Sequence, residues 1–374
     1  MTIYIFTEGD ASKLSAWSNV PYFLSTTLEK MGHRVVRVDI STMNFVRKVY
    51  NHTISKLLEM PCPQHAYQFE RTGVYNRLVE RKLRRTIVKA HNADLFIIMN
   101  FSFYNKWNQV PTITFSDWSY DYYIRVRCKR EPYFFERHYL LRQEEAIEHA
   151  TVVVSLFEEC ARYMQKQFSK AHVRFLGGNV VNAMLEPQGE MTDIIERKRR
   201  EKLILFIGMK KYISGAQLLV DAFHLIKKRI PDATLHVVGL VKNDLQNLTD
   251  GVYCYGYLHK DDESESKLYY DLLQKASLFV NPTEHWAGYS SMVEAMYYYT
   301  PIVVSPYQEF VGEFGADIDF GRYNMRFNAN SLADTMLDVL MSDVYVSFCE
   351  NAHERVKDYT WSSYVERFLK TAGL

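Results

Sequence analysis

Short apolar runs alternate with longer amphipathic stretches along this chain of 374 residues. In the first half the apolar runs are short and partly β-branched, as buried strands are. These predicted strands are Ile3–Thr7, Arg34–Ile40, Leu95–Met99, Thr112–Phe115 and Thr151–Ser155. Helices are predicted between them at Pro21–Met31 and Phe134–His149. Strand–helix alternation of this kind predicts an α/β fold with a parallel, doubly wound sheet.

The second half of the chain repeats the same plan. Its predicted strands are Leu203–Ile207, Thr234–Val238, Tyr253–Tyr257, Leu278–Val280 and Ile302–Ser305. Its predicted helices include Gly215–Arg229 and Glu265–Lys275. Because ligands of such sheets bind beyond the carboxyl ends of the strands, candidate site residues are expected in the loops that follow the strands.

A polar, charged segment separates the two halves. Glu186–Lys202 contains Pro187 and Gly189, a composition that fits an interdomain connection. Its charged run from Glu196 is interpreted as a solvated linker helix rather than a binding patch. Since the chain is longer than one core usually supports, we expect an N-terminal domain at 1–182, a linker at 183–202 and a C-terminal domain at 203–357.

The segment Leu278–Ser305 contains the most chemical information. It is predicted to form a strand, a small-residue loop, a helix that carries Glu294, and a second strand. Gly288, Ser290 and Ser291 lie where the backbone N–H groups and the dipole of a helix N-terminus favour an anion such as phosphate. Glu294 follows within about the first turn and can accept hydrogen bonds from hydroxyl groups. Donors for phosphate beside an acceptor for a sugar suit a nucleotide-sugar.

Composition excludes several other classes of function. A net charge of +1 argues against nucleic acid as a partner. The five cysteines contain no CxxC pair, which indicates a reducing compartment and no structural zinc. The chain begins MTIYIFTEGD, without a basic leader, and no apolar run reaches the length of a membrane span. We therefore expect a cytoplasmic enzyme.

Four segments of the second half, in this order and spacing, carry a family resemblance. They are LFIGMKKYISGAQLLVDAF, LHVVG, YGYLHKDDESESKLYYDLLQKASLFVNPTEHWAGYSSMVEAMYYYTPIVVS and ENAHERVKDYTWSSYVERFL. MGHRVVRVDI, VPTITFSDWS and HATVVVSLFEECARYM match more loosely in the first half. Together they resemble glycosyltransferase family 4, the group 1 transferases. The resemblance implies a GT-B architecture: two Rossmann-like domains face across a cleft, and a C-terminal helix at about 358–374 joins the N-terminal domain.

The resemblance also implies an activity. Members of the family move a sugar from a nucleotide-sugar, here a UDP- or GDP-sugar, to a hydroxyl of a glycan or lipid-linked acceptor. The N-terminal domain binds the acceptor and the C-terminal domain binds the donor. The family precedent is retention of configuration without an essential metal or other cofactor, often in the synthesis of surface polysaccharides or glycoconjugates. Nucleotide-sugar epimerases and sugar phosphorylases share the architecture and are alternatives within this class.

The donor site implied by the resemblance centres on Glu294. This residue matches the second motif glutamate, which contacts the ribose hydroxyls. The backbone at Ser290–Val293 would face the diphosphate, and Gly256–Leu258 would face the base. The complete set of expected donor-binding residues is Gly208, Lys210, Lys211, Tyr257, Glu284, His285, Trp286, Gly288, Ser290, Ser291 and Met292.

The chain departs from the family pattern at its first motif glutamate. The position eight residues before Glu294, which contacts the donor sugar in the family, is Trp286. Glu284 and His285 lie close enough to substitute, by a different loop path. Trp286 can stack on a sugar or base, or pack as a domain-edge aromatic residue, and His285 can equally be a loop residue with no role.

The chain also lacks the two cations with which the family clasps the diphosphate. Their positions are occupied by Met209 and Ser214. Lys210 and Lys211 could restore positive charge there, because a lysine neutralises phosphate as a point charge. The losses also fit an alternative outside the class, a catalytically inactive relative that acts as a partner subunit.

The acceptor side is represented by Asp117 and by the first strand–helix loop. Asp117, in SDWSYD, could act as the general base, which would point to inversion, or could orient the acceptor or hold its loop. The loop residues expected to line the acceptor site are Gly9, Asp10, Ser18 and Asn19. A polar turn with a helix cap explains each of the four equally well.

The segment Arg71–Lys89 is strongly basic. Its one acidic residue is Glu80, and its apolar residues have roughly helical spacing. A basic amphipathic helix can lie against anionic lipid, which would place the enzyme at the cytoplasmic face of the membrane. A helix packed on the N-terminal sheet, with a solvated basic side, is the favoured interpretation.

Overall fold

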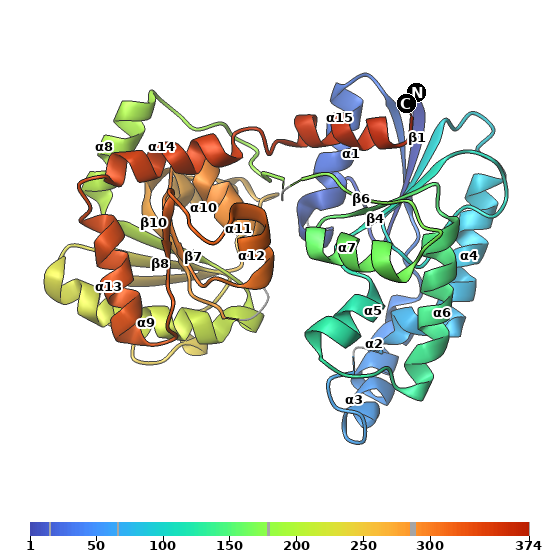
Figure 1. Cartoon of the computed structure of the whole chain (residues 1–374), viewed down its shortest axis with the longest axis horizontal. Helices are drawn as coiled ribbons and strands as arrows, with labels where there is room; N and C mark the ends of the chain where they lie inside the picture. The colour runs from blue at the N-terminus through green and yellow to red at the C-terminus, as the bar shows by residue number, and fades with distance from the viewer. Residues whose placement is uncertain (15, 66, 178–179, 285–288, 374) are drawn as a thin grey trace. The chain divides into compact units, whose positions relative to one another are not determined.

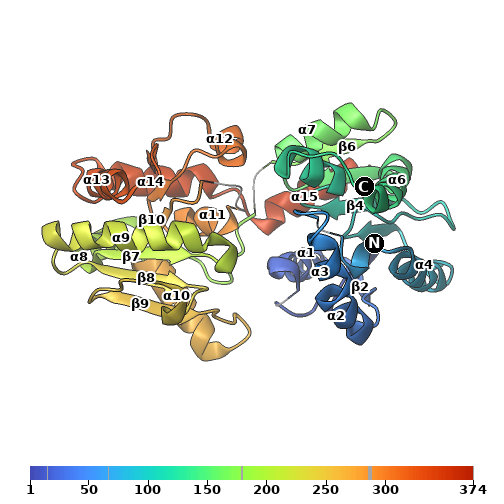
Figure 2. The same ribbon diagram turned by 90° about the horizontal axis from the view of Figure 1, so that it is seen from below.

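The computed structural model describes residues 1–14, 16–65, 67–177, 180–284 and 289–373. The chain forms two compact units. The first comprises Met1–Gly178 with Trp361–Leu374, and the second comprises Asn179–Thr360. In each unit, helices flank a central sheet (Figure 1 and Figure 2).

The first unit is built on a six-stranded parallel sheet in the order β2-β1-β3-β4-β5-β6. Its strands are β1 Thr2–Thr7, β2 Arg34–Asp39, β3 Leu95–Ile98, β4 Thr112–Ser116, β5 Val152–Ser155 and β6 Val173–Phe175. Its helices are α1 Val20–Lys30, α2 Asn44–His52, α3 Ile54–Glu59, α4 Gly73–Ile87, α5 Tyr120–Tyr122, α6 Phe134–His149, α7 Glu158–Gln167 and α15 Trp361–Thr371. The fully buried β3 and β5 explain why these strands are continuous apolar runs.

The second unit has the same design, with the strand order β12-β11-β10-β7-β8-β9. Its strands are β7 Leu203–Ile207, β8 Thr234–Val238, β9 Val252–Gly256, β10 Ala276–Asn281, β11 Ile302–Val304 and β12 Gly321–Tyr323. Its helices are α8 Met191–Glu201, α9 Ile213–Arg229, α10 Glu263–Lys275, α11 Ser290–Tyr297, α12 Gln308–Phe314, α13 Ala329–Leu340 and α14 Tyr345–Val356. The strand order reverses between β10 and β7, which is where such a sheet holds its ligand.

The predicted fold class is confirmed by these two parallel sheets. Strands β7 and β8 and helix α6 have the predicted limits, and the other predicted elements begin and end within about two residues of the observed ones. Parallel strands buried on both faces leave a strong signal in sequence, because each appears as an uninterrupted apolar run between polar loops.

The last helix of the chain, α15, lies in the first unit and packs on α1. The ring of Trp361 stacks on Phe23 with 6.3 Å between centroids, and Phe368 packs edge-on against Phe115 at 5.4 Å. The Arg367 guanidinium also donates a hydrogen bond to the carbonyl of Leu176. The chain therefore returns to its first unit after completing the second.

Helix α8 corrects one interpretation of the sequence. Its charged stretch is exposed or partly exposed, as expected, at every residue except Lys198, which is fully buried in the second unit. Its ammonium donates hydrogen bonds to the carbonyls of Leu273 and Ala276 and to Oγ1 of Thr300, at 2.9–3.1 Å. Burial lowers the pKa of Lys198 to about 7. This lysine is a core residue, although its sequence neighbours are charged.

Candidate functional site

The loops at the strand reversal of the second unit pack closely. Gly239, at φ +97°, lies so near Gly208 that a Cβ on it would be 2.4 Å from the Gly208 carbonyl oxygen. A Cβ on Gly215, in the first turn of α9, would be 2.5 Å from Oγ1 of Thr283. These glycines let the backbones after β7, β8 and β10 converge at one edge of the sheet.

Glu294 lies on α11 at this edge and is buried. Its Oε1 accepts a hydrogen bond from Nζ of Lys260 at 2.8 Å, and its Oε2 accepts one from the hydroxyl of Tyr269 at 2.8 Å. Lys260 also donates to the carbonyl of Asn182 at 3.2 Å, and its ammonium lies 4.4 Å from the centre of the Tyr269 ring. The carboxylate is therefore held by a cation and a phenol from the segment that follows β9.

The phenols around Glu294 remain protonated. Burial, reinforced by the charge of Glu294, raises the pKa of Tyr269, Tyr270 and Tyr298. Tyr269 is consequently a permanent hydrogen-bond donor to the carboxylate. A carboxylate oxygen can accept about two hydrogen bonds, so Glu294 keeps acceptor capacity for a ligand hydroxyl.

The two lysines expected at the diphosphate lie in the turn after β7. Lys210 is largely exposed and forms an ion pair with Asp244, with 2.9 Å between Nζ and Oδ1. This hydrogen bond lowers the pKa of Asp244. The ammonium of Lys211 lies 4.8 Å from the centre of the Tyr212 ring. Both cations are at the same sheet edge as Gly208, which directly follows β7.

The remaining donor-site predictions fall on the loops after β9 and β10. Tyr257 is half exposed and packs edge-on against His259 at 4.8 Å, and Glu284 is exposed. Ser290 and Ser291 are the first residues of α11, and Met292 is buried behind them. The predictions for His285, Trp286 and Gly288 lie outside the described residues.

The first unit has a cavity of about 300 Å³ beyond the carboxyl ends of β3 and β4. Its lining combines charged, amide and aromatic side chains, among them Arg71, Asn100, Asp117, Tyr120, Tyr139 and Gln143. Charged and amide groups beside aromatic rings are the composition expected of a site for a polar ligand with apolar faces, such as a sugar.

Asp117 follows β4 directly and is partly buried in this cavity. Its Oδ1 accepts hydrogen bonds from the backbone N–H of Trp118 at 2.8 Å and from the hydroxyl of Ser116 at 3.3 Å. Its carbonyl accepts a hydrogen bond from Ser155 on the neighbouring strand β5 at 3.0 Å. The carboxylate is thus held at a defined position on the cavity wall.

Arg71 enters the cavity from the short helix Phe69–Arg71. Its guanidinium carbon lies 4.3 Å from the centre of the Tyr120 ring and 5.7 Å from that of Tyr139. The Tyr120 backbone N–H donates to Gln143 at 2.6 Å, and its hydroxyl donates to Glu136 at 2.7 Å. The aromatic platform under Arg71 is therefore fixed at both ends.

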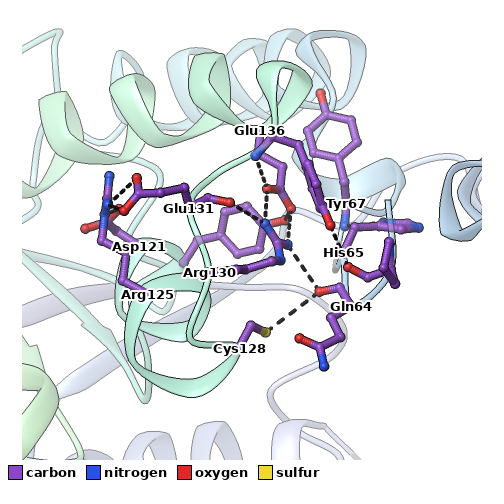
Figure 3. A network of polar contacts seen from close by, with 12 residues as sticks. Gln64, His65, Tyr67, Asp121, Arg125, Cys128, Arg130, Glu131 and Glu136 are labelled. Carbon is purple, nitrogen blue, oxygen red and sulfur yellow. Dashed lines mark hydrogen bonds and ion pairs between the residues drawn. The ribbon is translucent and has the colours of Figure 1, made fainter. Parts of the chain in front are cut away.

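Glu136 fixes this platform through a buried ion pair (Figure 3). The guanidinium of Arg130 donates to both of its carboxylate oxygens, at 2.7 and 2.8 Å, and also to the carbonyl of Gln64 at 3.1 Å. Burial opposes ionisation of the Glu136 carboxyl, but the hydrogen bonds from Arg130 and Tyr120 outweigh it and lower its pKa. The network stays charged and supports the cavity through the hydrogen bond from Tyr120 to Glu136.

The loop with the four predicted acceptor residues is dominated by local contacts. Gly9 has φ +97°, and its N–H donates to Asp39 at 3.0 Å. Asp10 accepts hydrogen bonds from the backbone and side chain of Ser12, at 2.9 and 2.6 Å. Ser18 and Asn19 have positive φ, and the Asn19 amide donates to the carbonyl of Leu14. None of the four lines the cavity that contains Asp117.

Sequence reasoning missed Lys260 and Tyr269 in the second unit and Arg71 and Tyr120 as a stacked pair in the first. Lys260 lies inside the matching segment YGYLHKDD, and that position was the available signal for it. Arg71 was counted among the basic residues of one segment, although it ends a separate helical turn before α4 begins. Within the described residues, no group of three or more His, Cys, Asp or Glu side chains is arranged to hold a metal ion.

Comparisons with known proteins show which proteins this chain is similar to. Residues 201–342 match the family described as glycosyl transferases group 1. No curated protein matches the sequence. Sucrose-phosphate synthase from Thermosynechococcus elongatus has a similar structure, with a TM-score of 0.69 and 17% identity over 99% of this chain and 98% of that chain.

Two further solved structures show the same likeness. A glycosyltransferase from Rickettsia africae has a TM-score of 0.66 and 15% identity, over 99% of this chain and 97% of that one. HepE from Anabaena, solved with UDP, has a TM-score of 0.65 and 13% identity over 100% of both chains. At these identities the likeness establishes the fold.

The chain has the GT-B fold. Its second unit contains a group 1 glycosyltransferase domain at residues 201–342. The resemblance stated from the sequence motifs is thereby confirmed.

Proposed function

We propose that this enzyme transfers a sugar from a nucleotide-diphosphate sugar to a hydroxyl of a glycan or lipid-linked acceptor. The observation that carries the proposal is the buried Glu294, held by Lys260 and Tyr269 at the ligand-binding edge of the group 1 domain. Structures of HepE with UDP-glucose and of TarM with UDP and alpha-GlcNAc-glycerol support a UDP-sugar donor. A GDP-sugar is the other donor considered.

In the donor site that we propose, Glu294 accepts hydrogen bonds from the ribose hydroxyls with its remaining lone pairs. The N-terminus of α11, at Ser290 and Ser291, faces the diphosphate. Negative charge develops on the leaving diphosphate during transfer, so preorganised donors there stabilise the transition state. Lys210 and Lys211, after β7, supply the positive charge that Met209 and Ser214 do not. Tyr257 faces the base, and Glu284 the donor sugar.

For the acceptor, we propose the cavity of the first unit, with its reactive hydroxyl at Asp117. The family precedent favours retention, in which the leaving diphosphate assists the incoming hydroxyl and Asp117 orients the acceptor. An inverting reaction with Asp117 as the general base is the alternative. Stereochemical analysis of the product by NMR decides between the two. The proposal needs no metal ion and no cofactor beyond the nucleotide-sugar.

A thermal-shift panel of UDP, GDP, ADP and CMP, each with and without a sugar, tests the donor site. We expect one nucleotide to raise the melting temperature of the wild type. Glu294→Ala should abolish this shift, whereas Glu201→Ala, which removes an exposed glutamate from the end of α8, should preserve it. No shift with any nucleotide would refute the donor site and favour the inactive partner subunit. That alternative would also gain support from nucleotide binding without transfer to any acceptor.

We propose a cytoplasmic enzyme with peripheral contact to the membrane face. Among the residues that the structure describes, no helix combines the length and apolar composition needed to cross a membrane. Helix α4 buries Val79, Leu83 and Ile87 in the core of the first unit, so it offers a membrane mainly charge. Exposed apolar side chains instead gather at α2 and α3, where Phe45 is 78% exposed and Leu57 is 68% exposed.

The α2–α3 segment matches an anionic lipid surface in charge. Residues 43–60 contain Arg47, Lys48 and Lys56 and one acidic residue, Glu59. We expect sedimentation with vesicles that contain phosphatidylglycerol, and little with pure phosphatidylcholine. Leu57→Ser should weaken the sedimentation, and Leu141→Ser, at an equally exposed site on α6, should not. Equal binding by both variants would refute contact through α2–α3.

A further inference from the structure

The cavity of the first unit contains a cation without a counter-ion. Among the described residues, no carboxylate lies within 4.0 Å of the Arg71 guanidinium, and its buried Nε has no hydrogen-bond partner. The contacts of the guanidinium are the rings of Tyr120 and Tyr139. A guanidinium that stacks on an aromatic ring keeps its N–H groups available at its edge, where they suit a planar or tetrahedral oxyanion.

Three acidic residues in this region, Glu8, Glu70 and Asp117, form no direct ion pair with Arg71, and Glu70 pairs with Arg47 at 3.7 Å. Glu8 accepts a hydrogen bond from the amide of Asn100 at 3.2 Å; burial raises the pKa of Glu8, although the nearby charge of Arg71 opposes the rise. A carboxyl with a raised pKa is a weaker counter-ion. Asp117 lines the cavity, with its Oδ1 engaged by Ser116 and Trp118. The positive charge of Arg71 is therefore uncompensated by an ion pair in a partly desolvated place, where an anion is favoured.

Arg71 is also held firmly in place. Its N–H donates to the carbonyl of Gln68 at 2.9 Å, and its own carbonyl accepts a hydrogen bond from Arg142 at 2.8 Å. The Tyr120 platform is anchored by Glu136 and Gln143. These contacts fix the backbone of Arg71, and its guanidinium lies over an anchored ring, which lowers the entropy cost of binding a ligand there.

We propose that the cavity binds an acceptor sugar that carries an oxyanion, a carboxylate or a phosphate group, and that Arg71 is the ligand of this anion. This inference rests on the proposed function, since it names the acceptor whose hydroxyl lies at Asp117. The volume of about 300 Å³ is at the lower end for ligand sites and suits one sugar unit. Arg71 then selects the acceptor through its anion, while Asp117 contacts its hydroxyl.

Binding of three acceptor probes to the full chain, measured by isothermal titration calorimetry, tests the inference without a donor. The probes are methyl glucuronide, methyl glucoside 6-phosphate and neutral methyl glucoside. We expect one charged probe to bind at least about tenfold more tightly than the neutral one, as a charge-assisted hydrogen-bond pair should. The probe that binds identifies carboxylate or phosphate as the anion. Equal binding of all three, or no binding of either charged probe, would overturn the inference.

Variants assign this preference to Arg71. Arg71→Gln should remove the preference, and Arg34→Gln should keep it, because Arg34 is an exposed arginine at the amino end of β2 in the same unit. If Arg71→Gln does not fold, Arg71→Lys replaces it. A lysine cannot form bidentate hydrogen bonds to the anion, so this change should reduce the preference for charged probes several-fold. A preference that survives both changes overturns the inference. If charged probes bind through Arg71 but no nucleotide-sugar supports transfer, the proposed function fails and the anion site stands.

Discussion

At the scale of single residues, the Lys260–Glu294 ion pair decides how the candidate donor site is held. Both side chains are at least 90% buried, and the carboxylate has one charged and one neutral donor. Removing one member of a buried pair leaves a charge without compensation, which costs much more than the intact pair contributes. The two residues should therefore behave as a unit.

Lys260→Met should lower the free energy of unfolding by about 3–5 kcal/mol, because Glu294 would remain buried without its cation. Adding Glu294→Gln should recover much of this loss, since the amide carries no charge. Lys267→Met, which removes an exposed lysine from α10, is the control. Urea unfolding of the wild type, Lys260→Met, Glu294→Gln and the double variant measures the coupling. Additive effects of the two changes would contradict a coupled pair.

Lys198 makes a prediction about pH. Burial lowers its pKa to about 7 in the folded protein, whereas an unfolded lysine titrates near 10.4. Between these values the unfolded chain binds more protons than the folded chain, so this residue makes stability rise with pH, by at most about 1.4 kcal/mol per pH unit. Below pH 7 both states are protonated, and the contribution becomes constant.

Urea unfolding from pH 7 to pH 9.5 checks this expectation. The stability of the wild type relative to Lys198→Met should increase over that interval. The stability of the wild type relative to Lys228→Met, which removes an exposed lysine of α9, should stay nearly constant over the same interval. A parallel course for both variants would show that Lys198 titrates normally.

At the scale of elements, two glycines of the second unit differ in what requires them: Gly239 follows β8 at the sheet edge, and Gly189 lies in the segment before α8. Gly239 and Gly189 both have φ near +100°, where a side chain is strained. A Cβ on Gly189 would meet nothing within 4 Å, whereas a Cβ on Gly239 would overlap the Gly208 carbonyl. Comparing substitutions at these two glycines therefore separates the effect of backbone strain from the effect of close loop packing.

Gly189→Ala should cost about 1–2 kcal/mol from its backbone conformation alone and leave nucleotide binding unchanged. Gly239→Ala should cost more, and should also weaken nucleotide binding, because the turn after β7 has to move. Unfolding in urea and nucleotide titrations measure the two effects. Equal behaviour of the variants would mean that the Gly208–Gly239 approach does not position the site.

The same elements show which features could be predicted from the sequence alone. Strand limits could be predicted because each buried parallel strand is a separate apolar run, and Glu294 could be chosen because its motif is local. Its partners could not, since Lys260 and Tyr269 lie 34 and 25 residues earlier and meet it only through the fold. Arg71 could not be singled out from the sequence for the same reason. What distinguishes it from the other basic residues is its contact with the Tyr120 ring, which only the fold brings about.

At the scale of the whole molecule, the proposed function assigns donor binding and acceptor binding to different units. The candidate donor residues lie in the second unit, and the cavity with Arg71 and Asp117 lies in the first. A substitution in one unit should therefore weaken binding of that unit's ligand alone, whereas a substitution in either site should reduce sugar transfer. This division distinguishes a transferase from a protein that only binds nucleotides.

Asp117→Asn tests the division. The change keeps the size of the side chain and removes its charge, so we expect nucleotide affinity within about twofold of wild type and a fall in kcat of about 100-fold or more. Glu294→Ala should show the reverse in binding, with loss of nucleotide affinity and undiminished binding of the charged acceptor probe. Transfer assays with the UDP-sugar, combined with separate titrations of nucleotide and acceptor, measure both. If Asp117→Asn transferred sugar at the wild-type rate, the reactive hydroxyl would lie elsewhere, and the cavity of the first unit would be a binding site without a part in the chemistry.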